Sequence, residues 1–378
     1  MTQPPLVDNS ARVYLAGHTG LVGSAIHRAL REAGFTDVVG RDVADVDMTD
    51  QAATRASLEA EKPDAVIVAA AKVGGIMANW EQPWEFIYLN LLIEANLIGA
   101  AFACGVRRLI FLGSSCIYPR EAPQPLREEY LLTGPLEETN RPYAVAKIAG
   151  IELCRSLNRE YGTDYLSLMP TNLYGPGDNF DLRTSHVLPA LIRRFHEAKL
   201  GLPEGGEEAE QATGHGAQAV GARQRRPHRP VTLWGSGAPR REFLYVDDVG
   251  RAVVHCLRHV SAADVPDGLL NVGCGEDLPI RDLALLVQRV VGHEGEIVWD
   301  TSKPDGTPRK LMDVSRITAL GWAPSVPLED GVRLAYEWYL ATCTAPDGSF
   351  VDPRRGARSP AAPSSARPSG VPSTSGEG

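Results

Sequence analysis

The sequence predicts an α/β protein with a doubly wound parallel sheet and a smaller C-terminal α/β domain. Two observations predict this fold class. Short apolar runs typical of buried strands alternate with helical patterns as far as Pro170, where the pattern changes. A glycine-rich turn also joins the first strand to the first helix. Alternating strands and helices form a parallel sheet because each helix crosses over and packs on a face of it.

The individual elements follow from the apolar periodicity of each segment. In the first domain we expect five strands, at residues 12–16, 37–39, 65–70, 108–112 and 165–169. The helices expected between them include 21–32, 84–103 and 143–160. In the second domain we expect helices 188–199, 246–257, 280–291 and 328–342 and a strand 270–272.

The same patterns divide the chain into regions. The first domain covers residues 11–170, and part of 230–275 is expected to return to it. The second domain covers residues 171–343. Residues 201–230 lack apolar periodicity and predict a flexible insertion, and residues 344–378, rich in Ala, Pro, Ser and Gly, predict a disordered tail.

The composition excludes several classes of protein. Of 378 residues, 43% are hydrophobic and 22% charged, and the net charge of -9 argues against a nucleic-acid binder. The six cysteines form no CxxC pair, so we expect no metal site and the reduced thiols of a cytoplasmic protein. Residues 1–12 lack an apolar signal-peptide core. The apolar run 86–104 contains Asn90, Glu94 and Asn96, which predicts a buried helix and no membrane span.

The glycine-rich turn has the features of a dinucleotide cradle. Gly17, Gly20 and Gly23 form a GxxGxxG pattern at the first strand–helix junction. The first glycine permits the tight turn, the second lets the backbone approach a pyrophosphate, and the third lets the helix pack close to the strand. Free N–H groups at the helix N-terminus then face the phosphates. A Rossmann cofactor site is therefore expected at Gly17, His18, Thr19, Gly20, Leu21, Val22 and Gly23.

The end of the second strand bears on which nicotinamide cofactor binds. Arg41 would hold the 2′-phosphate of NADP, whereas Asp42 would hold the free ribose 2′-hydroxyl of NAD. Because Arg41 comes first, we favour NADPH, with NADH as the alternative. Both side chains could instead be solvated turn charges. Asp47 and Met48, just beyond, are expected to meet the adenine.

A candidate catalytic set follows farther along the chain. Tyr143 and Lys147 have a YxxxK spacing within a helical pattern, so they share one helix face. The lysine can lower the pKa of the phenol and can hold a ribose hydroxyl. Ser114 and Ser115 follow the strand 108–112, and a hydroxyl at the carboxyl end of a strand reaches the ligand crevice. This set predicts a nicotinamide-dependent enzyme that acts on a carbonyl group.

These residues resemble the extended short-chain dehydrogenase/reductase family, over roughly residues 12–342. The likeness is closest to the members that epimerise and reduce a 4-keto GDP-sugar. It rests on residues 69–76 (AAAKVGGI), 112–119 (LGSSCIYP), 143–150 (YAVAKIAG), 170–178 (PTNLYGPGD), 185–189 (SHVLP), 234–248 (WGSGAPRREFLYVDD) and 303–310 (KPDGTPRK).

The resemblance implies a role for each matching residue. Ser114, Tyr143 and Lys147 match the catalytic triad of the reductive step. Cys116 and His186 match the acid/base pair of epimerisation, with a packed cysteine and a structural histidine as the ordinary alternatives. The other implied cofactor contacts are Leu112, Gly113, Ser114, Ser115, Lys147, Pro170, Thr171, Asn172, Leu173 and His186.

Four further residues match those that hold the GDP-sugar: Arg194, Trp234, Arg241 and Asp305. Trp234 could be a core residue only. The two arginines, each beside a second arginine, could be solvated charges, although a bidentate guanidinium suits phosphate.

The chain also departs from the family pattern. Thr19 and Val43 stand where members of the family carry arginines that grip the 2′-phosphate, so the preference for NADPH is expected to be weaker. The resemblance implies a homodimer built from helices 84–103 and 143–160. Two other functions stay open: another epimerase or dehydratase of the family, acting on a UDP-, dTDP- or GDP-sugar, and a non-catalytic NADP(H) sensor.

Overall fold

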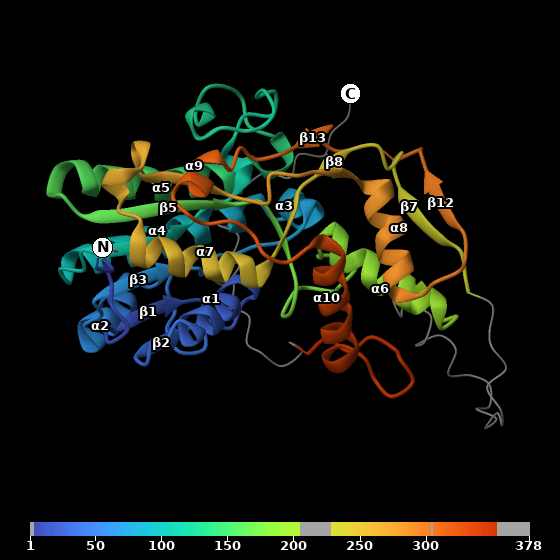
Figure 1. Cartoon of the computed structure of the whole chain (residues 1–378), viewed down its shortest axis with the longest axis horizontal. Helices are drawn as coiled ribbons and strands as arrows, with labels where there is room; N and C mark the ends of the chain where they lie inside the picture. The colour runs from blue at the N-terminus through green and yellow to red at the C-terminus, as the bar shows by residue number, and fades with distance from the viewer. Residues whose placement is uncertain (1–3, 205–227, 304, 354–378) are drawn as a thin grey trace, which may run out of the picture.

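The computed structural model describes residues 4–204, 228–303 and 305–353 (Figure 1). Its largest sheet has six strands, all parallel, in the order β10–β5–β4–β3–β1–β2. The strands are β1 (Val13–Ala16), β2 (Val38–Arg41), β3 (Ala65–Val68), β4 (Arg108–Leu112), β5 (Asp164–Pro170) and β10 (Leu269–Val272). The predicted doubly wound parallel sheet is confirmed.

Helices cover both faces of this sheet. On one face α1 (Leu21–Glu32) packs beside α7 (Val246–His259), over an apolar cluster that includes Val13, Leu15 and Ile110. Gly250 makes this close approach possible, because a side chain there would meet the carbonyl oxygen of Ala25 at 2.5 Å.

Three helices cover the other face: α2 (Gln51–Glu61), α4 (Pro83–Ala103) and α5 (Arg141–Tyr161). The sequence analysis did not predict α2. That helix buries only Thr54 and Leu58, so its apolar periodicity is weak, although the Asp50 carboxylate caps it by accepting from the Ala52 and Ala53 N–H groups.

Among the described residues, α4 alone is long and apolar enough to span a bilayer by length and composition. Its three polar residues nevertheless make contacts within the fold. Asn90 exchanges hydrogen bonds with the backbone of Lys72, and the Asn96 amide donates to the carbonyl of Met48 at 3.0 Å. Glu94 pairs with Lys147 of α5. These contacts are those of a core helix, as the polar interruptions predict.

A second apolar cluster lies beyond the carboxyl edge of the main sheet. Its elements are α6 (Val187–Lys199), β7 (Val231–Trp234), α8 (Ile280–Val291), β12 (Ile297–Asp300) and α10 (Leu328–Thr342). The chain first enters this region through β6 (Asn172–Tyr174) and leaves it through β9 (Phe243–Tyr245), and these two strands pair in parallel. It returns to the region after β10, with α8, β12 and α10. A small sheet of β11 (Leu278–Pro279), β8 (Arg240–Arg241) and β13 (Arg309–Lys310) also lies on this side.

Parts of the expected insertion and tail are ordered. Arg229 N–H donates to the Ala198 carbonyl at 3.0 Å, so the described end of the 201–230 segment is anchored to α6. Residues 344–353 turn back on α10. The centre of the Phe350 ring lies 3.8 Å from the Arg193 guanidinium. Backbone hydrogen bonds hold this turn as well, among them one from the Val351 N–H to the Cys343 carbonyl at 2.8 Å, so residues 344–353 differ from the expected disorder. The remaining expectations for these segments concern residues outside the described ranges.

Candidate active site

The glycine-rich turn has the close backbone approaches that its pattern predicts. Gly17 has a φ of +82°, and a Cβ there would lie 2.7 Å from the Ala70 backbone, after β3. A side chain at Gly23 would overlap the Gly17 carbonyl. Gly20 is the N-cap of α1 and offers no side chain to the first helical N–H groups. The turn is thus shaped to hold a phosphate on free N–H groups, which fits a dinucleotide.

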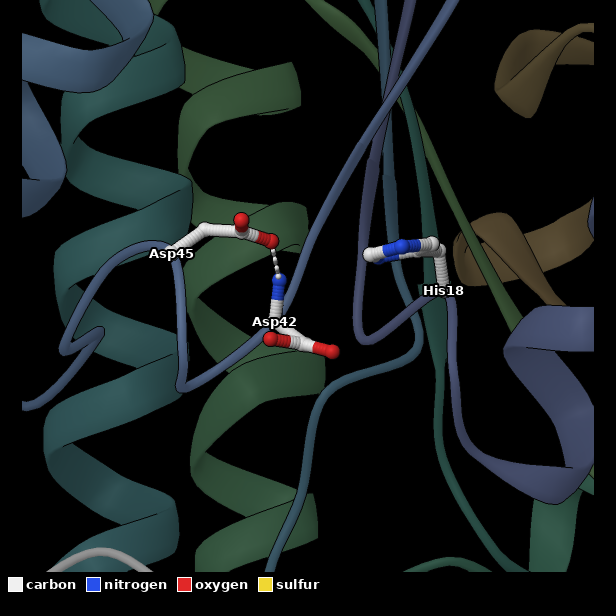
Figure 2. A group of neighbouring side chains, drawn as sticks. All are labelled: His18, Asp42 and Asp45. Atoms are coloured by element: carbon white, nitrogen blue, oxygen red, sulfur yellow. Dashed lines mark hydrogen bonds between the residues drawn. The ribbon is translucent and has the colours of Figure 1, made fainter. Parts of the chain in front are cut away.

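Figure 2 shows the corner between this turn and the end of β2. There an imidazole nitrogen of His18 and one carboxylate oxygen each of Asp42 and Asp45 lie within 4.8 Å of one another. His18 packs on Gly40, which has no side chain to block it. The Asp42 N–H donates to Asp45 at 3.0 Å. Burial alone would raise the pKa of Asp42, but hydrogen bonds from the Thr19 hydroxyl and the Ala44 N–H hold that pKa below its ordinary value. The corner therefore carries negative charge at neutral pH.

The two residues expected nearest the adenosine are held by the protein itself. Arg41 forms an ion pair with Glu61 at the end of α2 and donates to the Gly40 carbonyl at 2.9 Å. Asp47 accepts from the Thr49 N–H at 2.9 Å, and Met48 is buried in the core. Cofactor contacts by Arg41, Asp47 and Met48 stay predictions.

The predicted catalytic residues lie where β4 ends. Ser114 follows that strand and caps a short 3-10 helix, η1 (Ser115–Ile117), by accepting from the Cys116 N–H at 3.4 Å. On α5, the Lys147 ammonium donates to the Leu112 carbonyl at 3.0 Å and lies 5.7 Å from the centre of the Tyr143 ring. Burial raises the pKa of Tyr143 well above its ordinary value, and the nearby Cys116 and Glu94 raise it further. Tyr143 is therefore a protonated phenol near neutral pH.

Cys116 and His186 have different surroundings. Cys116 is 6% exposed, and burial raises the pKa of its thiol, while the positive charge of Lys310 opposes that rise. His186 is the N-cap of α6, exposed to solvent but crowded by protein, and this partial desolvation lowers its pKa. Within the described residues His186 forms no hydrogen bond or ion pair with the Ser114–Tyr143–Lys147 set, and its role stays a prediction.

The loop before His186 is held against the turn after β3 by backbone contacts. The Gly75 N–H donates to the Thr184 carbonyl at 3.0 Å, and a side chain at Gly75 would meet the Ser185 carbonyl at 2.8 Å. This approach explains Gly75, whereas a side chain at Gly74 would meet Cβ of Ala78 at 3.0 Å. The same approach brings His186 to the carboxyl edge of the sheet.

The segment that leaves β5 connects the two regions. Thr171 is buried, and its N–H donates to the Val272 carbonyl at 3.0 Å. The Asn172 amide donates to the Glu242 carbonyl at 2.8 Å, and Leu173 pairs with Leu244 across β6 and β9. Pro170–Leu173 is thus a rigid element beside the catalytic set, where a nicotinamide ring could rest.

The structure distinguishes the two members of each arginine pair. Arg193 is buried and paired with Glu197 at 2.7 Å, and Arg240 pairs with Asp277 at 2.8 Å, so both have structural partners. In the described parts of the chain, Arg241 donates to the carbonyl oxygens of Arg240 and Thr307 and forms no ion pair, and burial lowers its pKa. An anion contact by Arg241 stays a prediction.

The other expected substrate residues, Arg194, Trp234 and Asp305, lie in the second region, and their contacts with a substrate stay predictions. Arg194 pairs with Glu204 and lies 3.4 Å from the Thr232 carbonyl. Trp234 is 63% exposed at the end of β7, with the Lys303 ammonium 5.6 Å from the centre of its ring. Asp305 accepts from the Ser236 N–H at 2.9 Å and from its hydroxyl at 2.6 Å, which joins the 303–310 segment to the turn after β7.

Sequence reasoning missed Lys310, although it lies in the 303–310 segment. β13 pairs with β8 so that Lys310 is directly opposite Arg241. Lys310 and Arg241 thus lie side by side, and Lys310 is the one close to the Cys116 thiol. Two adjacent cations suit a diphosphate or an enolate-like oxygen. The signal was a second pair of basic residues, Arg309 and Lys310, that mirrors Arg240 and Arg241 across the small sheet.

A proton-donating phenol beside a dinucleotide cradle equips an enzyme for carbonyl chemistry, and the fold and site define a nicotinamide-dependent oxidoreductase. Comparison with known proteins agrees. Residues 13–273 match the NAD dependent epimerase/dehydratase family. The chain is 52% identical to probable GDP-L-fucose synthase 1 of Oryza sativa subsp. japonica over 336 residues, covering 89% of this chain and 94% of the relative.

Two further comparisons show where the chain stands within this family. The chain is 49% identical to GDP-L-fucose synthase of Escherichia coli K12, covering 87% of this chain and 96% of the relative. It also superimposes with a TM-score of 0.78, at 35% identity, on a GDP-D-glycero-L-gluco-heptose synthase of Campylobacter jejuni solved in the presence of NADPH, covering 88% and 99% of the two chains. The chain belongs to the NAD dependent epimerase/dehydratase family and, within it, to the GDP-L-fucose synthases.

The electrostatic role of Lys310 can be tested on the Cys116 thiol. Lys310→Met removes the positive charge that opposes the burial effect, so the pKa of Cys116 rises. Alkylation by iodoacetamide at pH 8, followed at the Cys116 peptide by mass spectrometry, should slow about tenfold for each unit of that rise.

Arg309→Met is the matched control, because Arg309 is on the same strand but pairs with Asp277. It should leave the alkylation rate unchanged. Equal rates in Lys310→Met and the wild type would show that the Lys310 charge does not reach the thiol.

Proposed function

We propose that the protein converts GDP-4-keto-6-deoxy-D-mannose into GDP-L-fucose by epimerising C3 and C5 and then reducing C4 with NADPH. It is thus both an isomerase and an oxidoreductase of nucleotide-sugar metabolism. The observation that carries this proposal is Cys116, a potential acid or base, at the same strand end as Ser114 and close enough to Tyr143 to affect its charge. An enzyme that only reduced a ketone would not need this thiol.

The epimerising half of the reaction uses the acidity of protons beside a ketone. The C4 carbonyl acidifies the protons on C3 and C5, so a base can remove each one and an acid can return it on the opposite face. We assign Cys116 and His186 to this pair, since a thiol and an imidazole can each give and take a proton; burial raises the pKa of the thiol, and desolvation lowers that of the imidazole. Lys310 and Arg241 supply positive charge on the same side, which stabilises the enolate oxygen and the diphosphate.

The reductive half uses the Ser114–Tyr143–Lys147 set. A bound nicotinamide supplies the hydride to C4. Tyr143 gives its proton to the C4 oxygen, Ser114 donates a hydrogen bond to the same oxygen, and Lys147 holds a ribose hydroxyl with the one ammonium donor left after Leu112 and Glu94. Residues 170–173 would hold the nicotinamide ring.

The division of labour between the two regions follows from these roles. Residues 11–170, with α7 and β10, hold the NADP(H), and residues 171–343 mainly hold the GDP-sugar through Arg194, Trp234, Arg241 and Asp305. The free cysteines support a reducing, cytoplasmic environment. Neither nucleic acid nor a membrane has a part in this function.

We also propose that two copies associate through α4 and α5. These helices pack side by side on one face of the sheet, and each leaves large apolar side chains exposed: Trp84 and Tyr88 on α4, Val145 and Leu153 on α5. Trp84 and Tyr88 stack at 4.7 Å, which makes a flat aromatic surface. Exposed apolar area of this kind favours a protein partner.

The proposed reaction is tested with GDP-4-keto-6-deoxy-D-mannose and NADPH in deuterated water, with product NMR. The wild type should yield GDP-L-fucose with deuterium at C3 and C5. Tyr143→Phe should lose reduction by a hundredfold or more, in the range of about 10²–10⁴ expected for a general acid, while deuterium still enters C3 and C5. A product that keeps the D-manno configuration rules out the epimerase half, and a folded Tyr143→Phe protein without exchange rules out separate roles.

The cofactor corner predicts weak discrimination between NADPH and NADH. Thr19 and Val43 supply no charge to a 2′-phosphate, Asp42 repels it, and Arg41 is shared with Glu61. A charge-assisted bond contributes about 1.5–3 kcal/mol, or about tenfold to a hundredfold in affinity. Thr19→Arg should therefore raise the affinity for NADPH over NADH, and Asp42→Asn on top of it should raise this ratio again.

The measurement is the Kd of each cofactor by fluorescence titration, together with kcat/KM. Thr36→Arg adds the same charge before β2, at the opposite edge of the sheet, and should change neither ratio. A wild-type preference for NADPH above about a thousandfold, roughly 4 kcal/mol, would contradict the charge argument.

The dimer is tested by light scattering. The wild type should have twice the chain mass of 40.8 kDa, and Trp84→Arg should shift it toward a single chain because a buried unpaired charge is costly at an interface. Val298→Arg, on the exposed side of β12, is the control and should not change the mass. A wild-type mass of one chain would contradict this interface.

A further inference from the structure

A buried ion pair lies one helical turn from Tyr143. The Lys147 ammonium on α5 is 2.9 Å from a carboxylate oxygen of Glu94 on α4, and the two side chains are 2% and 1% exposed. Among the residues that the structure describes, neither side chain pairs with another charged group, and the ammonium also lies 4.9 Å from the centre of the Phe111 ring. Glu94 stands outside the residues that the sequence analysis assigned to the site.

The Glu94 carboxylate occupies space that a side chain at position 150 would otherwise fill. A side chain at Gly150 would meet one Glu94 oxygen at 2.8 Å and overlap the Phe111 ring. Within the described residues neither Glu94 oxygen has a well-aligned hydrogen bond. Removing a carboxylate from water is expensive, and an apolar side chain of similar volume usually serves stability as well or better. A charge kept in such a place points to an electrostatic role.

The charges around Tyr143 come from three elements. Lys147 of the same helix brings positive charge close to the ring, Glu94 of α4 brings negative charge, and η1 contributes Cys116. Phe86 of α4 faces the ring edge-on at 6.2 Å and is uncharged. Lys310 of β13 faces Cys116 rather than the phenol. An ammonium alone favours the phenolate, whereas an ammonium paired with a carboxylate has a weak net field.

We propose that Glu94 is a positioning residue of the reductive step, whose carboxylate balances the Lys147 ammonium and so keeps Tyr143 a protonated phenol. The inference rests on the proposed function, because the direction of the proton transfer gives it meaning. Reduction delivers a hydride to C4, the C4–O π pair moves to the oxygen, and that oxygen takes the Tyr143 proton. Solvent then returns a proton to Tyr143. A phenolate could not supply that proton.

The pair also sets where Lys147 points. Two of its three ammonium donors face Leu112 and Glu94, inside the protein, and only one remains for a ribose hydroxyl. Without Glu94 the buried ammonium would have one carbonyl and two aromatic rings around it. The pKa of Glu94 is raised overall, because burial outweighs the opposing effect of Lys147. We assign the ionised pair, because the Lys147 ammonium lies 2.9 Å from the Glu94 carboxylate in a site where an unpaired charge would be costly.

The test follows Tyr143 itself by NMR of protein labelled with [¹³Cζ]tyrosine, with the Tyr143 signal assigned by its absence in Tyr143→Phe. In the wild type the signal should stay that of a phenol from pH 7 to about pH 9.5. In Glu94→Gln a nearby negative charge is lost, and this loss lowers the pKa of the Tyr143 phenol. Its titration midpoint should fall by about one pH unit or more, which is a tenfold change in the phenolate ratio.

The pH profile of kcat for reduction supplies a second measurement. Its alkaline limb should move to lower pH in Glu94→Gln by the same amount as the NMR midpoint, while deuterium exchange at C3 and C5 keeps its wild-type profile. Glu85→Gln is the matched control, because Glu85 on the same helix pairs with Lys72 at 2.7 Å and is one-third exposed. It should leave the midpoint and the alkaline limb in place.

Three outcomes would overturn the inference. One is an unchanged Tyr143 midpoint in folded Glu94→Gln. A second is a loss of activity that is uniform across pH, with weaker cofactor binding, which would make Glu94 only a structural counter-ion of Lys147. The third needs no variant and applies even if Glu94→Gln does not fold: a wild-type Tyr143 that is already phenolate below pH 8. Because the NMR titration needs no sugar nucleotide, a failure of the proposed reaction is seen separately, in the wild-type product assay.

Discussion

The parallel direction of the six strands is the constraint on which the site depends. All six carboxyl ends emerge at one edge of the sheet, so turns that follow different strands meet there although they are far apart in sequence. The glycine-rich turn follows β1, the acidic corner follows β2, the Gly74–Gly75 turn follows β3, and Ser114 follows β4. The second region then packs over the same edge and adds Arg241 and Lys310. An antiparallel sheet would send half of these turns to the opposite edge.

Much of this arrangement could be predicted because it is encoded locally. The glycine turn, the YxxxK spacing and the serines after β4 are each defined within a few residues, and the sheet follows from the alternation of apolar strands and helices. The weakly patterned α2 escaped prediction because only Thr54 and Leu58 of that helix are buried. Its residues are alanines, charges and short polar side chains, which carry no clear period.

Other features depend on partners distant in sequence and could not be read locally. Arg193 and Arg194 are equivalent in the sequence, and only the packing against the distant Phe350 shows that Arg193 is the buried one. The significance of Lys310 depends on a strand pairing with residues about seventy positions earlier, and that of Glu94 on a helix contact across more than fifty. In the same way Arg41 reads as a free phosphate ligand until Glu61, from the next helix, is seen beside it.

The way α7 and β10 join the first region has a consequence for how the molecule could be divided. α7 covers α1 and one face of the sheet, and β10 is the edge strand beside β5, yet both come after the chain has built α6, β7 and β9. A fragment that stopped at residue 170 would lack that edge strand and expose the apolar cluster around Leu15 and Ile110. No single cut therefore separates two self-sufficient pieces. The two regions thus depend on each other to fold, and evolution could not exchange one of them without the other.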